Sequence, residues 1–161
     1  MITVTPLSKE ERAGLLAFMR PIWEETYAFL PGEQIDLLLL KYFSPEGLRR
    51  YGEMGYQYFR ISDGEESGIL VAVEREEDVY LDKLYLPPSA RGRGIASAAF
   101  DFLAEQGKPI VLNVNQKNLR AIRCYEKNGF RRVAEERIDL GQGLVNVDFV
   151  YRGEAAREDL S

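Results

Sequence analysis

The clearest pattern of apolar and polar positions lies between Val79 and Gln106, and it predicts a strand, a turn and a helix. The run from Val79 to Leu86 is rich in leucine and tyrosine. Pro87-Pro88 ends this strand, because proline cannot donate to a sheet ladder. A helix should open near Gly92 to Gly94. Its inward face recurs at the i, i+3, i+4, i+7, i+8 spacing and consists of Ile95, Ala98, Ala99, Phe102 and Leu103.

The first thirty residues predict a short strand over 2–5 and then two helices. Ser8 and Glu11 have the spacing of a capping box, which starts a helix over 9–19. Pro21 is expected to interrupt that helix, since proline removes one backbone hydrogen bond. Helical pattern then resumes over 22–30, with several aromatic residues.

Further helices and two strands lead to the central strand. An apolar stripe that predicts the next helix consists of Ile35, Leu38, Leu39 and Tyr42. Ser44 then caps a short helix with Pro45 in its first turn. Strands over 56–61 and 68–74 flank a polar turn. Together with the central strand they predict an antiparallel meander.

After the glycine turn, the apolar run over 110–114 predicts a strand parallel to the central one, because the intervening helix supplies the crossover. Segments 130–139 and 144–151 should pair as a hairpin about Gly141-Gln142-Gly143. A chain of 161 residues suits one domain over 1–152. The remaining residues, 153–161, are small or charged and predict a frayed tail.

The turn from Arg91 to Ala96 has the composition of a phosphate-binding loop. Glycines let backbone N–H groups approach a ligand, and the first amides of a helix carry partial positive charge. Arg91 and Arg93 add charge that could be aimed at a pyrophosphate. The spacing matches neither the Rossmann fingerprint nor the P-loop.

A second motif follows in a predicted helix, where Asn118, Ala121 and Tyr125 are spaced i, i+3 and i+7 and so share a face. Asn128-Gly129 should end this helix, since both residues tolerate a left-handed conformation.

The two motifs in this order, R-x-x-G-x-A after a strand and then N-x-x-A-x-x-x-Y-x-x-x-G-F, resemble the GNAT superfamily of acetyl-coenzyme A dependent N-acyltransferases. The resemblance covers about 56–151. It implies an α/β fold: a mixed, strongly twisted sheet of six to seven strands, flanked by helices on both faces, with a splayed parallel strand pair that holds the cofactor. It also implies acetyl-coenzyme A as cosubstrate. No metal is expected, because a chain without histidine lacks the ligands of most zinc sites.

The resemblance assigns cofactor contacts to main-chain groups of the central strand and to the turn. The pantetheine arm would bind along Leu84, Tyr85 and Leu86, where an N–H faces the thioester oxygen. The pyrophosphate would lie on the turn, with Asn118 as a further contact. The turn residues are Arg91, Gly92, Arg93, Gly94, Ile95 and Ala96, and Ala96 stands where the family often has glycine.

By the same resemblance, Tyr125 would protonate the departing thiolate, which a phenol with a pKa near 10 can do at neutral pH. The general base stays open. Asp82 is one candidate, two residues before Leu84 on the same strand face. Glu24 and Glu25 are further candidates, in the aromatic segment that would form the acceptor wall, and a water relay is the alternative.

Aromatic residues near the N-terminus have two readings: they either line an amine pocket through cation–π contacts or pack in the core. They are Trp23, Tyr27, Phe29, Tyr56 and Tyr58.

Composition removes several function classes. The chain has no histidine, which excludes histidine-activated nucleophiles, and Cys124 is its one cysteine. A net charge of −5 disfavours a nucleic-acid partner. No apolar run is long enough to span a membrane, and the start lacks signal-peptide features, so a cytoplasmic location is expected.

These observations predict an N-acetyltransferase that moves an acetyl group to a primary amine of a small molecule or protein by direct attack in a ternary complex. A non-catalytic acyl-coenzyme A sensing module is the alternative, although it would have no use for Tyr125. The acceptor, the length of the acyl group and the oligomeric state stay open. Segment 144–151, taken as an edge strand, suggests a homodimer.

Overall fold

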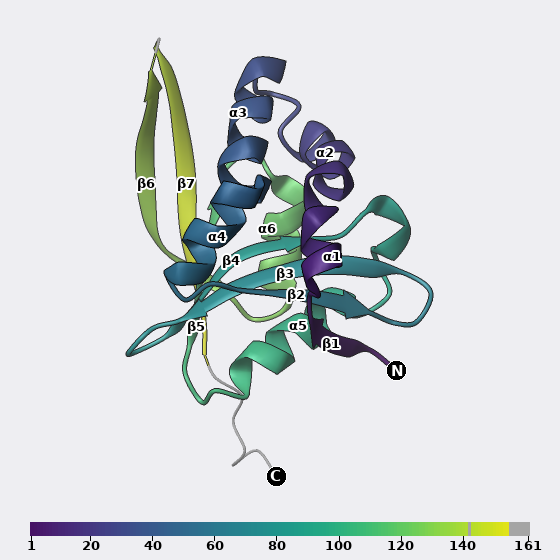
Figure 1. Ribbon diagram of the computed structural model, residues 1–161. Coiled ribbons are helices and arrows are strands. Elements are labelled where there is room, and N and C mark those ends of the chain that lie inside the picture. Colours follow the sequence, from purple (N-terminus) through teal and green to yellow (C-terminus); the bar gives the residue numbers. More distant parts are fainter. Residues whose placement is uncertain (142, 155–161) are drawn as a thin grey trace. The chain divides into compact units, whose positions relative to one another are not determined.

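The structure is a computed structural model that describes residues 1–141 and 143–154. Its strands are β1 (Thr3–Pro6), β2 (Gln57–Ser62), β3 (Ser67–Glu74), β4 (Val79–Tyr85), β5 (Ile110–Asn115), β6 (Arg131–Gly141) and β7 (Leu144–Gly153). Its helices are α1 (Lys9–Ala13), α2 (Leu15–Thr26), α3 (Gly32–Phe43), α4 (Pro45–Glu53), α5 (Ile95–Ala104) and α6 (Leu119–Lys127), with a 3₁₀ turn η1 (Pro88–Ala90) (Figure 1).

The strands form one mixed sheet in the order β1-β2-β3-β4-β5-β7-β6. β4 and β5 run parallel from Val79↔Ile110 to Leu81↔Leu112, with α5 as the crossover between them in the chain. β2 and β3 are antiparallel, as are β6 and β7. The predicted α/β class and the mixed sheet with a parallel pair are therefore confirmed, and the sheet has seven strands where six to seven were expected.

The described chain divides into two compact units. The first unit holds Met1–Val73 and Lys83–Ile95, and the second holds Glu74–Asp82 and the described residues from Ala96 on. The assignment of 1–152 to one domain stays a prediction. Of the expected tail, residues 155–161 lie outside the described residues, as does Gln142 of the expected hairpin turn.

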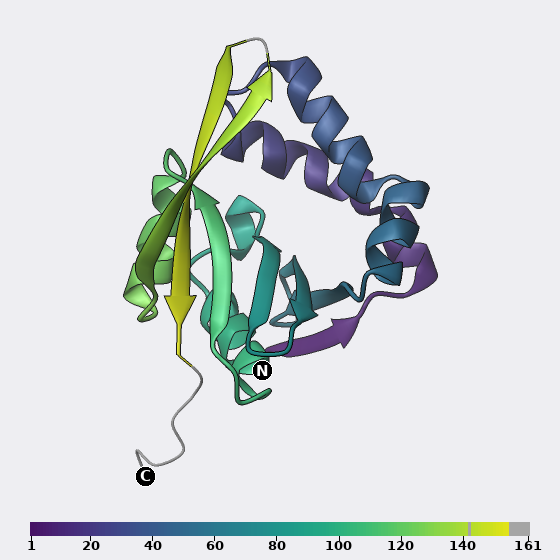
Figure 2. The same ribbon diagram turned by 90° about the vertical axis from the view of Figure 1, so that its left-hand side faces the viewer.

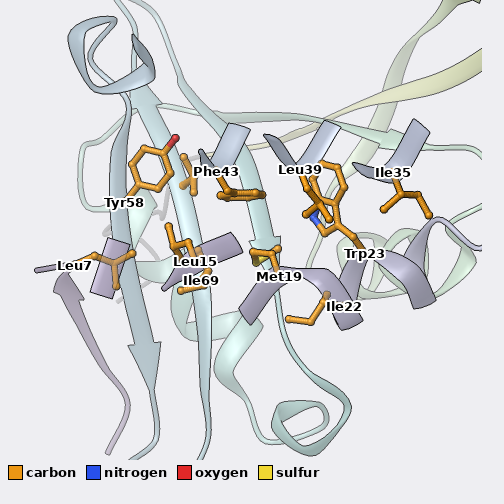
Figure 3. Packing of buried hydrophobic residues seen from close by; sticks show 11 residues of the cluster. Leu7, Leu15, Met19, Ile22, Trp23, Ile35, Leu39, Phe43, Tyr58 and Ile69 are labelled. Atoms are coloured by element: carbon orange, nitrogen blue, oxygen red, sulfur yellow. The ribbon is translucent and has the colours of Figure 1, made fainter. Parts of the chain in front are cut away.

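In the first unit, α2 and α3 present regular apolar stripes to one core (Figure 3). The buried positions of each helix recur at i, i+4 and i+8, with Ile22 of α2 at i+7, as one helical face requires. The core consists of Leu7, Leu15, Met19, Ile22, Trp23, Ile35, Leu39, Phe43, Tyr58, Ile69 and Val71. It joins these two helices to the strands β2 and β3.

In the second unit, an aromatic cluster joins α5, α6 and β7. The Phe100 ring lies 5.9 Å from that of Tyr125 and 4.9 Å from that of Phe130, centroid to centroid. Tyr151 of β7 lies 6.4 Å from Tyr125. β6 and β7 form a long antiparallel hairpin (Figure 2), and Tyr151 of this cluster lies on β7.

Local capping signals were confirmed, but the helix break near the N-terminus was predicted at the wrong residue. Ser8 and Glu11 form the expected capping box. The break falls at Gly14, whereas Pro21 lies inside α2. The buried positions around the proline, Met19 and Ile22, keep α2 continuous because their burial outweighs one lost backbone hydrogen bond.

Of the predicted inward face of α5, Ile95, Ala99 and Leu103 are buried, whereas Ala98 is only half-buried. Phe100 is buried, whereas Phe102 is only half-buried. The aromatic contacts of Phe100 come from Tyr125 and Phe130, which later parts of the chain supply and helical periodicity alone does not reveal.

The prediction of an edge strand at 144–151 was wrong. β7 lies between β5 and β6, because its residues from Asp148 to Gly153 pair with β5. The edges of the sheet are β1 and β6. The homodimer stays a prediction, but segment 144–151, on which it was based, does not lie at an edge of the sheet.

Candidate functional site

The end of β4 lies very close to β3 in the first unit. A Cβ on Gly68 would stand 2.2 Å from Leu86 Cδ2 and 2.8 Å from the carbonyl oxygen of Tyr85, so only glycine fits there. The Tyr85 hydroxyl is hydrogen-bonded to that of Tyr27 at 2.8 Å. These contacts fix Tyr85 and Leu86. Leu84, Tyr85 and Leu86 are all half-buried.

The turn that follows needs its glycines. Gly92 and Gly94 have φ of 73° and 83°, a left-handed conformation that other residues rarely adopt. Within the described chain, no hydrogen bond is recorded from the backbone N–H of Gly92, Gly94 or Ile95. Since α5 begins at Ile95, this turn presents amide donors where a helix N-terminus favours an anion.

Both arginines of the turn bind carboxylates of the first unit. Arg91 Nη2 lies 2.5 Å from Glu25 Oε1, and its Nε donates to the Leu86 carbonyl at 3.1 Å. Arg93 Nε lies 2.5 Å from Asp63 Oδ2 in the β2–β3 turn. The turn is thus anchored on two sides through its side chains, which leaves its amides as donors for a ligand.

The Arg93 guanidinium, together with backbone N–H groups of Glu65 and Glu66, holds the pKa of Asp63 far below its usual range. Asp63 therefore remains ionised in any ordinary buffer, and its link to Arg93 is maintained.

The base candidates named from the sequence lie in different units. Glu25 belongs to α2 in the first unit, where the structure brings it against Arg91. Asp82 is half-buried on β4, in the second unit.

Asn118 and Tyr125 both belong to α6 and its cap in the second unit. The Asn118 side chain accepts a hydrogen bond from the backbone N–H of Ala121 at 3.3 Å, so it caps the helix. Tyr125 is 9% exposed and lies among the rings of Phe100, Phe130 and Tyr151. The role of Tyr125 as an acid stays a prediction.

Sequence reasoning missed a buried cation in the first unit. Lys83 is 6% exposed, and its Nζ lies 3.7 Å from the centroid of the Tyr42 ring. Phe43 is 5.9 Å from the same nitrogen. Lys41 also lies over the Tyr42 ring, with its Nζ 5.3 Å from the centroid, so this ring contacts cations of the protein itself. Of the predicted set, Trp23 and Tyr58 are buried in the core, whereas Phe29 is 38% exposed.

A polar network across three strands of the second unit was also missed. Asn146 donates to Asp148 Oδ1 at 2.9 Å, and Asn113 also hydrogen-bonds this carboxylate. Tyr80 donates to Asn113 Oδ1 at 3.0 Å, and Asn115 is hydrogen-bonded to Asn146. The signal was present in the sequence, as polar residues at alternate positions of two strands, but only the register brings them together.

Burial raises the pKa of the half-buried Asp148 carboxyl. The hydrogen bonds from Asn146 and Asn113 lower this pKa, while the negative charge of Glu136 raises it further.

Among the described residues, no group of three or more potential ligand side chains is arranged to hold a metal ion. Within the same part of the chain, no helix has the length and apolar character needed to cross a bilayer.

Comparison with known proteins gives consistent relatives. The model of the acetyltransferase (GNAT) family matches residues 17–130. The peptidyl-lysine N-acetyltransferase YjaB of Salmonella typhimurium is 25% identical over 154 residues, which cover 94% of this chain and 99% of that protein.

Two solved structures share the fold. PaiA N-acetyltransferase from Thermoplasma acidophilum, in complex with coenzyme A, has a TM-score of 0.73 at 22% identity and covers 96% of this chain and 99% of its own. The solution structure of apo-form YjaB from Escherichia coli has a TM-score of 0.71 at 19% identity, covering 97% of this chain and 99% of its own.

Proposed function

Because the chain belongs to the GNAT family of acetyltransferases and is therefore an acyltransferase, we propose that it moves an acetyl group from acetyl-coenzyme A to a primary amine. The observation that carries the choice of cosubstrate is the glycine turn before α5. Its amides at Gly92, Gly94 and Ile95 have no recorded acceptor in the described chain. A pyrophosphate supplies the anionic oxygens that such donors bind.

In this proposal, the amides of Gly92 to Ala96 hold the pyrophosphate, and Arg91 and Arg93 hold the turn in shape. Main-chain groups of Leu84, Tyr85 and Leu86 bind the pantetheine arm, and Asn118 supports the cofactor from the α6 cap. Bound acetyl-coenzyme A supplies the activated acyl carbon. An N–H of the Leu84–Leu86 segment donates to the thioester oxygen as negative charge develops on it.

Tyr125 donates the proton that the departing thiolate needs. An unperturbed phenol has a pKa of about 10 and is protonated at neutral pH. The surrounding rings of Phe100, Phe130 and Tyr151 fix the orientation of the side chain. A donor held in place loses little entropy on proton transfer.

The amine attacks directly, in a ternary complex, without an acetylated enzyme. Burial raises the pKa of the Cys124 thiol, which disfavours the thiolate form that a nucleophile would need. The chain also has no histidine to activate a hydroxyl or thiol.

For the acceptor, we propose lysine side chains of peptides as the first class to examine, followed by small amines. Support comes from the relative named a peptidyl-lysine N-acetyltransferase, which matches over 94% of this chain. The cytoplasmic location and the dimer predicted from the sequence stay predictions.

The test is thiol release from acetyl-coenzyme A with lysine peptides, polyamines, amino acids and aminoglycosides, comparing wild type with Tyr125→Phe. We expect turnover with one amine class and at least a tenfold lower kcat in the variant, in the range of general acid catalysis. Tyr151→Phe is the matched control, because Tyr151 is also a buried tyrosine of the second unit and should keep nearly full kcat.

Calorimetry with coenzyme A separates this proposal from a sensing module. Tight binding without turnover on any amine would favour the sensing module. Absence of binding would contradict both functions.

A further inference from the structure

The end of α2 contacts the proposed cofactor segment at two points. The hydroxyl of Tyr27, the C-cap residue of the helix, is hydrogen-bonded to that of Tyr85 at 2.8 Å. The carboxylate of Glu25, in the last turn of the helix, lies 2.5 Å from Arg91 Nη2. The first contact reaches the strand segment proposed for the thioester, and the second reaches the turn proposed for the pyrophosphate. All four residues belong to the first unit.

Arg91 connects these two parts of the cofactor segment. Its Nε donates to the Leu86 carbonyl at 3.1 Å, while its Nη2 binds Glu25. A guanidinium is planar and rigid, so bonds from two of its nitrogens fix both its position and its orientation. Because Gly92 directly follows Arg91 in the chain, holding this side chain restricts where the amides of the turn can point.

The turn needs such a restraint before a ligand arrives. Gly92 and Gly94 have positive φ, and glycine loses more conformational freedom on ordering than any other residue. A loop that becomes ordered only on binding loses part of its binding free energy to that ordering. An anchor that already holds the turn in the free protein therefore increases affinity.

We propose that Glu25 is a positioning residue of the cofactor site, which acts through Arg91 to hold the glycine turn and the Leu86 carbonyl in the geometry that binds acetyl-coenzyme A. This inference rests on the proposed function. It gives Glu25 a role other than general base, since its carboxylate is engaged by the guanidinium of Arg91. Asp82, Glu24 and a water relay stay as candidates for the base.

In the alternative arrangement, Arg91 binds the pyrophosphate itself and Glu25 competes with the ligand for the guanidinium. The two arrangements predict opposite effects of removing the Glu25 carboxylate: weaker binding of coenzyme A if it positions the turn, and tighter binding if it competes. The contact between Arg91 Nε and the Leu86 carbonyl favours positioning, because it ties the guanidinium to the strand segment.

The experiment measures the affinity for coenzyme A by calorimetry in wild type, Glu25→Gln, Arg91→Ala and the double variant. Arg91 is half-buried, so its ion pair is screened less than a fully exposed one, and Glu25→Gln should raise Kd roughly fivefold. In the Arg91→Ala background, the same substitution should change Kd by less than about twofold, because the guanidinium through which Glu25 acts is absent.

Asp36→Asn is the matched control. Asp36 forms another ion pair with α2, to Arg20 at the same distance of 2.5 Å, and this pair does not involve the turn. Its loss should leave the Kd for coenzyme A within about twofold of wild type.

Turnover with the best acceptor found separates positioning from proton transfer. Glu25→Gln should raise the KM for acetyl-coenzyme A by about the same factor as Kd, with little of the effect in kcat. The acid limb of kcat/KM against pH should stay at its wild-type position. If Glu25 were the general base, kcat would instead fall strongly and the acid limb would be lost.

Each outcome supports or overturns the inference. Weaker binding in Glu25→Gln that disappears in the Arg91→Ala background supports it. Tighter binding, an equal effect in both backgrounds, or a loss of kcat at unchanged Kd overturns it and leaves the acetyltransferase proposal standing. If Glu25→Gln does not fold, the same cycle uses Glu25→Asp, which keeps the charge on a shorter side chain, and an unchanged Kd in both backgrounds overturns the inference.

Failure of the proposed function gives a different result. A wild type that binds coenzyme A without turnover on any amine would contradict the acetyltransferase proposal, while the calorimetric cycle would still decide the role of Glu25. A wild type that does not bind coenzyme A would contradict both.

Discussion

Each of the two units carries an ionisable side chain at a buried or half-buried position, and each stabilises it differently. In the first unit, Lys83 lies against the faces of Tyr42 and Phe43. In the second, Asp148 accepts hydrogen bonds from the amides of Asn113 and Asn146. Ring faces attract a cation and offer little to a neutral amine. Amides can hydrogen-bond both forms of a carboxyl group.

This difference separates a side chain whose contacts favour its charged form from one whose surroundings favour its neutral form. The ring contact attracts the Lys83 cation, and this charge would repel a cationic acceptor at the same rings. Burial raises the pKa of Asp148 and so favours proton uptake there. Four predictions examine the comparison, from the largest expected effect to the smallest.

Reversing the charge at Lys83 should have the largest effect on stability. Lys83→Glu places a carboxylate against two ring faces, and we expect the free energy of unfolding to fall by about 3 kcal/mol or more, as for an uncompensated buried charge. Lys83→Met keeps the length of the side chain and should cost only about 1–2 kcal/mol. Urea unfolding followed by circular dichroism measures both variants. Equal losses in the free energy of unfolding would mean that the sign of the charge at position 83 does not matter to stability.

A hydrogen bond from an uncharged donor in the second unit should contribute less to the free energy of unfolding than charge reversal at Lys83 removes. Tyr151 donates to Glu126 Oε2 at 2.8 Å, and Tyr151→Phe removes this one hydrogen bond. The expected loss is about 1 kcal/mol, the typical value for a hydrogen bond. The same unfolding measurement applies, with Glu126→Gln as the partner variant. A loss in the free energy of unfolding as large as that of Lys83→Glu would contradict the expected order of the two effects.

Two carboxyl groups should respond to pH with opposite signs. Asp63 has a lowered pKa, so its contribution is present above the ordinary carboxyl pKa and is lost on acidification. Asp148 has a raised pKa, so its contribution is present at low pH and is lost as pH rises through the folded-state value.

Thermal unfolding of Asp63→Asn and Asp148→Asn between pH 3 and pH 8 measures this difference. Asp63→Asn should lose less stability than wild type on acidification. Asp148→Asn should lose less than wild type as pH rises above about 4, the ordinary carboxyl range. If the difference in stability from wild type changed with pH in the same direction in both variants, the opposite pKa shifts of Asp63 and Asp148 would be contradicted.

The smallest effect should come from an exposed ion pair. Arg49 and Glu53 of α4 are 3.0 Å apart, and both side chains are 64% exposed. Arg49→Ala should change the free energy of unfolding by only about 0.3–0.5 kcal/mol. Denaturant titration with and without 0.5 M salt measures this change. A loss above about 1 kcal/mol in the free energy of unfolding would mean that the different solvent exposure of Arg49 and Lys83 does not explain their different contributions to stability.

Features that depend on neighbouring residues in the chain could be predicted from the sequence. Ser8 and Ser44 cap helices as their spacing indicates, and the glycine turn before α5 has the conformation that its composition requires. These signals act over a few residues, so no tertiary information is needed to interpret them.

Features that depend on register could not be predicted. Asn146 and Asp148 are visible as alternating polar residues of their strand, but their neighbours emerge only when β7 aligns Asp148 with Asn115 of β5. Lys83 reads as an ordinary charge in a strand until α3 places Tyr42 against it. Pro21 was misjudged because the burial that overrides its helix-breaking character comes from distant residues.

The buried indole of Trp23 makes the protein its own optical reporter. Trp23 is the single tryptophan of the chain, is 3% exposed and lies in the first unit (Figure 3). Among the described residues its ring nitrogen has no hydrogen-bond partner. Its emission should therefore be blue-shifted in the folded state. A change in that emission isolates events in the first unit without any label, because the second unit has no tryptophan to add a signal.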